Sequence, residues 1–275
     1  MTAIPMQRAD PGFADSGKPR WTFAVDGWRV NVDNMTTLLD RIVAQLRSSA
    51  ASFMVCTLNL DHLVKLRRSG EFRNAYLRAR YVTADGFPIV ALARLTGCAI
   101  ERTTGADLIE PVCELAARHR LSVFLMGSTL PALCTSAARL VDRHPGLDVC
   151  GVFVPPRSFD PGSPVAQDII DLVTSSGARI CFIALGAPRQ ELFAARAIEQ
   201  TSGVCFLPIG AGLDFIAETQ RRSPKLLRRM QLEWAWRLAL DPARLWKRYA
   251  QCIFLLIDLL VRRRYFSTMA TQLAD

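Results

Sequence analysis

The sequence lacks any hydrophobic run long enough to cross a lipid bilayer. Its longest strongly apolar stretch, Cys252–Val261, has ten residues and is interrupted by Asp258, whereas a spanning helix takes about 20 apolar residues. The first 20 residues also lack the apolar core of a signal peptide. We therefore expect a flexible lead-in over residues 1–20 and a protein that stays in the cytoplasm.

Cysteine and histidine are not arranged as metal ligands. The eight cysteines form no Cys-x-x-Cys pair, and most lie within apolar segments, which is typical of small core residues. The three histidines, His62, His119 and His144, lie apart from one another and from any cysteine pair. The sequence therefore predicts no structural metal site and no bound cofactor.

Three nucleotide-binding patterns are missing. The absence of Gly-x-x-x-x-Gly-Lys-Ser/Thr excludes a P-loop nucleotide hydrolase. The segment GAGLDF, from Gly210 to Phe215, resembles a dinucleotide fingerprint but lacks its third glycine and the acidic residue on a following strand. No Asp-x-Asp pair is present to hold a divalent ion on a diphosphate. A bound sugar nucleotide would therefore be neutralised by backbone amides and arginines.

Positive charge is concentrated in one part of the chain. Of the formal net charge of +9, residues 218–264 carry +8, with twelve Lys or Arg against four acidic residues. The first 217 residues are nearly neutral, with 22 basic and 20 acidic groups. An anionic partner is therefore expected to meet the C-terminal segment.

Short apolar runs alternate with amphipathic stretches from Phe53 onward. The runs predict strands at FMVCTL, YVTAD, LSVFLMG, LDVCGVF, ARICFIALG and GVCFLPIG. This alternation predicts an α/β fold with a largely parallel, Rossmann-like sheet and helices on both faces. The segment FAVDGWRVNVDN near the start predicts a hairpin or an edge strand.

The strand pattern stops after Asp214, so the remainder is expected to form a C-terminal helical appendage. Asp241 followed by Pro242 reads as an N-cap and a first helical residue, which places a break between two helices near Leu240. We therefore expect an α/β catalytic domain over residues 21–217 and a basic helical appendage over residues 218–275.

Ligands of doubly wound sheets bind beyond the carboxyl ends of the strands. The polar and glycine residues that follow the predicted strands there are Thr57, Asn59, Asp61, His62, Asp85, Gly127, Ser128, Gly186 and Gly210. Asp85 reads equally well as a general base or as an Asx-turn or N-cap residue for the next helix, and Asp61 as a residue that opens a helix. Taken alone, Arg102 reads as a solvated loop arginine, and Glu191 as a residue that suits a helix dipole.

These segments together resemble the WecG/TagA/CpsF family of bacterial glycosyltransferases, glycosyltransferase family 26. The resemblance covers about residues 25–249 and rests on ten ordered motifs: TLNLDH, ADGFPIV, ERTTGADL, VFLMGS, HPGLDVCGVF, ALGAPRQE, IGAGLDF, RRSP, LEWAWRL and DPARLWKRY. It implies an inverting, metal-independent transfer of a hexose or N-acetylhexosamine-type sugar. The implied donor is a UDP-sugar, and the implied acceptor is a polyprenyl-diphosphate-linked sugar in exopolysaccharide or cell-surface glycan synthesis.

The resemblance also implies roles for individual residues. Asp85 corresponds to the base that deprotonates the acceptor hydroxyl. Thr57 and Asn59 would line the sugar and acceptor pocket, Arg102 and Gln190 would contact the donor, and Arg237, Arg244 and Arg248 would close over the diphosphate. Gly127 and Gly186 are the further implied substrate-binding residues. Two positions depart from the family pattern, because Glu218 and Gln231 stand where many members have glycine. Both departures concern the path of the appendage.

The appendage also has the composition of a helix that lies in a membrane interface. Trp234, Trp236, Trp246 and Tyr249 interleave with arginines, and an apolar run follows. We therefore expect a peripheral protein on the inner face of the bacterial cell membrane, with an anionic membrane surface as partner and no nucleic acid. Association with further copies of the chain is left open. The alternative is a non-enzymatic basic module that binds a membrane surface or RNA, which would have no use for Asp85.

Overall fold

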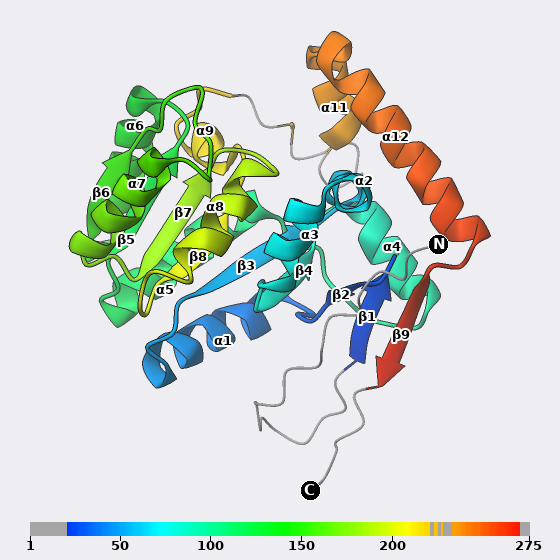
Figure 1. The fold of residues 1–275 in the computed structure, drawn as a ribbon, viewed down its shortest axis with the longest axis horizontal. Helices are drawn as coiled ribbons and strands as arrows, with labels where there is room; N and C mark the ends of the chain where they lie inside the picture. The colour runs from blue at the N-terminus through cyan, green and yellow to red at the C-terminus, as the bar shows by residue number, and fades with distance from the viewer. Residues whose placement is uncertain (1–20, 221–222, 225–226, 228–232, 270–275) are drawn as a thin grey trace, which may run out of the picture.

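A six-stranded parallel sheet forms the centre of the molecule in the computed structural model, which describes residues 21–220, 223–224, 227 and 233–269 (Figure 1). The strand order is β4-β3-β8-β7-β5-β6, and every neighbouring pair is parallel. The strands are β3 (Phe53–Leu58), β4 (Tyr81–Ala84), β5 (Val123–Gly127), β6 (Val149–Phe153), β7 (Ile180–Ala184) and β8 (Cys205–Pro208). The predicted α/β class with a parallel sheet is confirmed.

Helices cover both faces of this sheet, and each face has its own hydrophobic core. Along β3, Met54 and Cys56 belong to one core, and Phe53 and Val55 belong to the other. The first core is covered by α2 (Leu60–Arg68), α3 (Gly70–Leu77), α4 (Phe87–Leu95), α7 (Pro164–Ser175) and α8 (Arg189–Ala197). The second is covered by α1 (Met35–Ser48), α5 (Gly105–His119), α6 (Leu130–Arg143) and α9 (Gly212–Ile216). Strands buried on both faces explain the continuous apolar runs in the sequence.

A small antiparallel sheet adjoins this body. Strands β1 (Trp21–Val25) and β2 (Trp28–Val30) form the predicted hairpin around an Asp-Gly turn, in which Asp26 and Gly27 both have positive φ. The third strand is β9 (Tyr265–Met269), which pairs with β1 from Val25 to Trp21. The expectation that no strand follows Asp214 was therefore wrong. β9 forms because β1, near the start of the described chain, pairs with it.

Two helices precede β9. α11 (Glu233–Leu240) and α12 (Pro242–Val261) are separated at Asp241, as predicted from the Asp-Pro step. The inner face of α12 packs on α2 and buries Leu245, Cys252, Leu255 and Leu259. Within the described part of the chain, no helix is both long and apolar enough to span a membrane.

Arg67 of α2 connects the two ends of the described chain. Its guanidinium makes two contacts with the buried Asp26 carboxylate, at 2.6 and 2.9 Å, and a third with Asp258 of α12 at 2.8 Å. Arg264 reaches the same Asp26 at 3.3 Å, just before β9. The hairpin, α2 and α12 are therefore fastened to one another by charge as well as by packing.

Candidate active site

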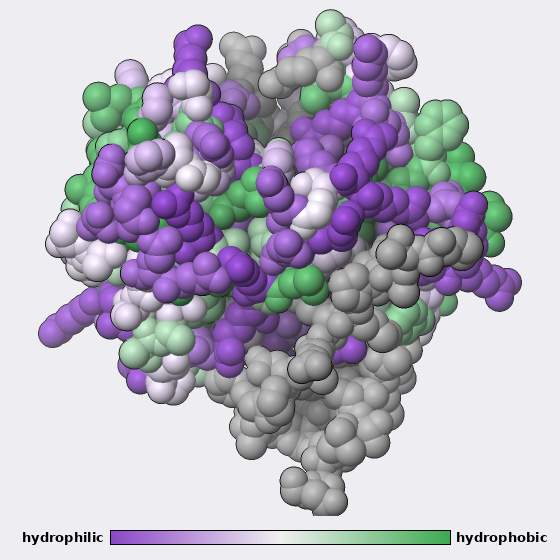
Figure 2. All heavy atoms as spheres, viewed as in Figure 1, coloured by the Kyte–Doolittle hydropathy of each residue, from purple (hydrophilic) through white to green (hydrophobic). Residues whose placement is uncertain are grey.

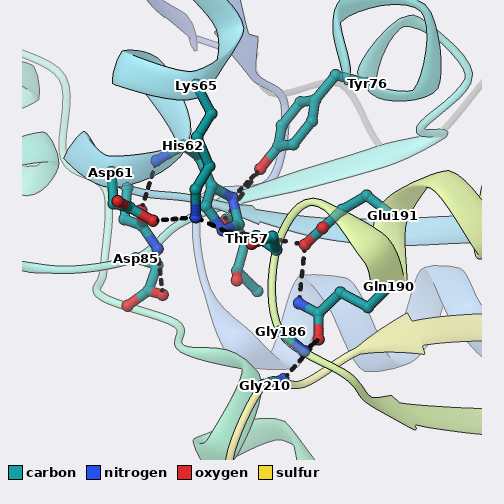
Figure 3. Close-up of polar contacts among 12 residues, drawn as sticks. Thr57, Asp61, His62, Lys65, Tyr76, Asp85, Gly186, Gln190, Glu191 and Gly210 are labelled. Atoms are coloured by element: carbon teal, nitrogen blue, oxygen red, sulfur yellow. Dashed lines mark hydrogen bonds and ion pairs between the residues drawn. The ribbon is translucent and has the colours of Figure 1, made fainter. Parts of the chain in front are cut away.

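The predicted site residues that follow β3 and β4 lie together at the carboxyl edge of the parallel sheet. β3 and β4 pair in register, so that Thr57 stands beside Thr83 and Leu58 beside Ala84. Asn59 and Asp85 follow the two strands directly, and the Asn59 amide nitrogen donates to Asp85 Oδ2 at 3.1 Å. Figure 3 shows Asp85 next to Asp61 and below His62. The structure thus brings the candidate base and a candidate pocket residue into direct contact.

The Asn59 side chain is fixed at both ends. Its oxygen caps α2 by accepting from the His62 backbone N–H at 2.9 Å, which leaves the nitrogen for Asp85. The expectation that Asp61 opens this helix was wrong, because Asn59 is the N-cap. Gly86, and not Asp85, is the N-cap of α4, so the N-cap alternative for Asp85 was also wrong.

Asp61 lies in an ion-pair cluster that joins three elements. Its two oxygens contact Arg248 of α12 at 2.9 Å and Lys65 of α2 at 2.5 Å. Lys65 also donates to the Ala187 carbonyl in the loop after β7, at 3.1 Å. Burial raises the pKa of Asp61, but the charges of Arg248 and Lys65 outweigh burial and hold that pKa below its usual range. A carboxylate paired at both oxygens is a weak base, which favours Asp85 for that role.

Gln190 joins the loops that follow β7 and β8. Its side-chain oxygen accepts from the backbone N–H of Gly186 at 3.1 Å and of Gly210 at 3.0 Å. Its nitrogen donates to Glu191 Oε1 at 2.8 Å, and the residue is buried. The single oxygen of Gln190 therefore holds the backbone of both loops in place.

A buried polar network continues from Glu191 toward β3 (Figure 3). Glu191 Oε1 lies 3.9 Å from His62 Nε2, and His62 Nδ1 lies 2.6 Å from the Tyr76 hydroxyl, which donates to the Thr57 carbonyl at 3.3 Å. Burial raises the pKa of Glu191 to about 7 and lowers the pKa of His62 to about 3. From the sequence, Glu191 was expected only to suit the helix dipole, and the polar pattern alone did not reveal that its side chain is buried.

The loop after β5 adds a second glycine position and a serine. A Cβ at Gly127, where φ is +106°, would collide with the Ala184 carbonyl of β7, so the close approach of the two strands requires glycine there. The next residue, Ser128, donates its hydroxyl to the Asp214 carboxylate of α9. This contact was not evident from the sequence, and it joins the loop after β5 to α9, the helix that follows β8.

Arg102 borders a hollow at the β4 edge of the sheet. Its backbone pairs with that of Ala84, the residue before Asp85, and its guanidinium lies 3.3 Å from the Asp107 carboxylate. The hollow has a volume of about 250 Å³ and is lined by Phe87, Val90, Arg94, Ile100, Glu101 and Arg102. The lining combines three apolar side chains with Arg94, Arg102 and Glu101, so it offers both apolar contact and charged groups to a sugar ring.

The three arginines of the appendage are placed to different extents. Arg248 lies against Asp61, as described above. Arg237 and Arg244 belong to α11 and α12, but their side chains lie outside the described residues, as does the whole of Gln231. Glu218 has a φ of +61°, a conformation that glycine adopts more readily, and it pairs with Arg139 at 3.2 Å.

A metal centre is not formed by the side chains that are described. Among them, no three His, Cys, Asp or Glu residues are grouped so that they could hold a metal ion.

Comparison with known families identifies the chain. Residues 24–269 match the model of the Glycosyl transferase WecG/TagA/CpsF family, which is nearly the whole chain. The protein belongs to this family and is a glycosyltransferase. The alternative of a non-enzymatic basic module was therefore wrong.

Proposed function

We propose that this glycosyltransferase moves a hexose or N-acetylhexosamine-type sugar from a UDP-sugar to a polyprenyl-diphosphate-linked sugar, with inversion and without a metal ion. The product would serve exopolysaccharide or cell-surface glycan synthesis. The observation that carries the proposal is the Asn59–Asp85 contact at the edge where the strands end, because it presents an oriented carboxylate at the expected ligand site.

In the proposed reaction, Asp85 accepts the proton of the acceptor hydroxyl. The freed oxygen forms a bond to the anomeric carbon of the donor sugar while the bond from that carbon to the β-phosphate oxygen breaks. UDP leaves with the electron pair, and a single displacement inverts the anomeric carbon. General-base assistance of this kind contributes roughly 10²- to 10⁴-fold to the rate. Asn59 supports it by holding one carboxylate oxygen in place.

The leaving diphosphate needs positive charge and N–H donors. Arg248 and Lys65 meet at Asp61, next to the loop after β7, so they are the described cations best placed for this task. Arg237 and Arg244 are further candidates from the family pattern. Gly127, Gly186 and Gln190 would shape the donor side through their loops, and Thr57 would line the sugar pocket.

The hollow beside β4 is the proposed position of the acceptor sugar. Two of its lining residues lie close to Asp85, because Phe87 follows it by two residues and the backbone of Arg102 pairs with the preceding Ala84. The volume of about 250 Å³ suits one sugar ring, and Arg94 and Arg102 outnumber Glu101 in the lining, which suits an attached diphosphate. An acceptor bound there would point a hydroxyl toward Asp85.

A lipid-linked acceptor also requires docking at a membrane. The outward face of α12 exposes Ile253 by 53%, Phe254 by 72%, Ile257 by 53% and Val261 by 78%. Figure 2 shows hydrophobic side chains along the right-hand edge of the molecule, where α12 runs in Figure 1. Exposed apolar residues flanked by arginines are typical of a helix that lies in an anionic membrane interface. We propose that this face docks on the inner side of the cell membrane.

A transfer assay tests the proposed function. Purified protein is incubated with a panel of labelled UDP-sugars and vesicles that contain a polyprenyl-diphosphate-linked sugar, with EDTA present. We expect one donor to label the lipid and UDP to bind with the same affinity with and without EDTA. Absence of transfer from every donor would contradict the acceptor class, and loss of UDP binding on chelation would contradict the metal-free mechanism.

A further inference from the structure

A buried chain of polar groups connects the ends of β3, β7 and β8 (Figure 3). It begins at the backbone N–H groups of Gly186 and Gly210, which both donate to Gln190. It continues to Glu191, whose Oε1 lies 3.9 Å from His62 Nε2, beyond hydrogen-bond distance. From His62 it continues through Tyr76 to the Thr57 carbonyl. We call this chain the relay. Its four side chains, Gln190, Glu191, His62 and Tyr76, are at most 5% exposed, so water does not replace their contacts. The relay touches three of the loops that surround the proposed donor site.

The orientation of the Gln190 amide determines which Glu191 oxygen accepts a hydrogen bond. Because two backbone N–H groups occupy the Gln190 oxygen, its nitrogen faces Glu191 and donates to Oε1. Glu191 therefore acts as an acceptor at Oε1. Its second oxygen, Oε2, is buried and has no hydrogen-bond partner in the described structure. Burying a charged oxygen without a hydrogen-bond partner costs much free energy, whereas burying a neutral acid costs far less.

The groups that face Glu191 make its charge sensitive to pH near neutrality. Burial is the main cause of its pKa of about 7, while Lys65 lowers that pKa and Asp61 raises it, both from α2. Its ionisable neighbours on the other packed elements are Tyr76 of α3 and the Cys56 thiol of β3, and burial raises the pKa of both. His62 stays neutral because burial lowers its pKa to about 3.

A neutral His62 has two possible arrangements of its single ring proton. When Glu191 is ionised, the proton is favoured on Nε2, facing the carboxylate, and Nδ1 then accepts from the Tyr76 hydroxyl. When Glu191 is protonated, the negative charge 3.9 Å from Nε2 is gone, so the ring proton is no longer favoured on Nε2 and is free to occupy Nδ1. Nδ1–H then donates to the Tyr76 oxygen, and the Tyr76 hydroxyl donates to the Thr57 carbonyl. The Tyr76 hydroxyl has one hydrogen, so it holds either His62 or Thr57.

We propose that Glu191 is a positioning residue for sugar transfer, whose protonation selects the His62 tautomer and so decides whether Tyr76 holds the Thr57 carbonyl at the end of β3. The neutral form of Glu191 is the active one. It lets His62 donate to Tyr76 and Tyr76 donate to the Thr57 carbonyl, and it removes a negative charge next to the loops that would receive an anionic diphosphate. The effect on turnover rests on the proposed function, whereas the tautomer exchange does not.

Rates measured between pH 5.5 and 9 test the effect on turnover. We expect the kcat/KM of the wild type for its UDP-sugar to fall at least threefold from pH 6 to pH 8, as Glu191 ionises. Glu191→Gln keeps the acceptor toward Gln190 but does not ionise, so this decline should disappear. Tyr76→Phe removes the hydroxyl that transmits the change and should also flatten the profile. The control is Glu199→Gln, an exposed glutamate near the end of α8, which should keep the wild-type profile.

A spectroscopic measurement without substrate separates this inference from the proposed function. Nitrogen NMR of the His62 ring reports which nitrogen carries the proton. We expect the proton to move from Nδ1 to Nε2 between pH 6 and pH 8 in the wild type, and to stay on one nitrogen in Glu191→Gln. Tautomer exchange without any sugar transfer would contradict the proposed function alone. An unchanged tautomer, or an undiminished pH decline in Glu191→Gln, would overturn the role of Glu191.

Discussion

The contact between Asp85 and Asn59 bears on a choice of roles that the sequence left open. From the sequence, Asp85 read equally well as a base or as a turn residue. In the structure Gly86 is the N-cap of α4. The Asp85 carboxylate accepts from the Asn59 amide nitrogen, and the Asn59 oxygen caps α2, which fixes the orientation of that amide. An oriented carboxylate at a strand end favours the base over the cap.

Replacing Asp85 by asparagine tests this assignment. The amide has the same shape but does not accept a proton, so turnover should fall by roughly 10²- to 10⁴-fold. UDP affinity, measured by calorimetry, and the midpoint of thermal unfolding should stay close to those of the wild type. If Asp85→Asn turned over like the wild type, the base would be another group, and Asp61 would be the next residue to replace.

At the scale of elements, the parallel strands were predictable and β9 was not. Strands buried on both faces leave continuous apolar runs such as FMVCTL, which stand out from the amphipathic helices between them. β9 has the mixed sequence YFSTM and becomes a strand only because β1 offers it a partner far away in the chain. Its local sequence therefore carried too little information to predict it.

The candidate site divides in the same way. Residues that stand directly after strands, such as Asn59 and Asp85, were predictable because parallel strands end at one edge. Lys65 was missed, although its spacing of four from Asp61 on a helix is a signal that sequence reasoning can use. The buried role of Glu191 depends on which side of α8 packs against α3 and on where His62 lies. Neither follows from the local pattern.

The docking of α12 on α2 should depend on pH through Asp61. Because Arg248 and Lys65 hold its pKa below the unfolded value of about 3.9, the ion pairs stabilise the fold above that pH and cease to do so as pH falls through the folded pKa. Asp61→Asn should therefore lower the free energy of unfolding at pH 7 and have a much smaller effect near pH 3. Urea denaturation at both pH values measures this difference.

Asp171→Asn serves as the control, because Asp171 is an exposed carboxylate of α7. It should change stability by less than about 0.5 kcal/mol at either pH. An equal loss of stability at pH 7 and pH 3 for Asp61→Asn would mean that the side chain acts through packing and not through its charge.

At the scale of the whole molecule, α12 has two faces with different tasks. Its inner face fastens to α2, and its outer face exposes large apolar side chains. Removing the entire C-terminal segment would also remove β9 from the small sheet and Arg264 from the buried Asp26. Substitutions on the outer face are therefore a better test of membrane docking than a truncation.

Changing Ile253, Phe254 and Ile257 together to serine should weaken binding to anionic liposomes at least tenfold, because about 1.4 kcal/mol of lost apolar contact is enough for that change. Transfer to a water-soluble acceptor analogue should remain near the wild-type rate. Liposome co-sedimentation and the soluble assay measure the two effects. The matched control is Val141→Ser with Leu172→Ser, which are exposed apolar residues of α6 and α7. Undiminished liposome binding by the triple variant would place the docking surface elsewhere.

The pairing of β1 with β9 has a consequence for chain entropy. It joins segments about 240 residues apart and closes nearly all of the described chain into a ring. The entropic cost of closing a ring rises only with the logarithm of its length, so each doubling of the intervening chain adds only about 0.6 kcal/mol. The loops between these two strands are therefore free to lengthen with little effect on ring closure, while α12 stays held by β9 at its C-terminal end and by α2 along its length.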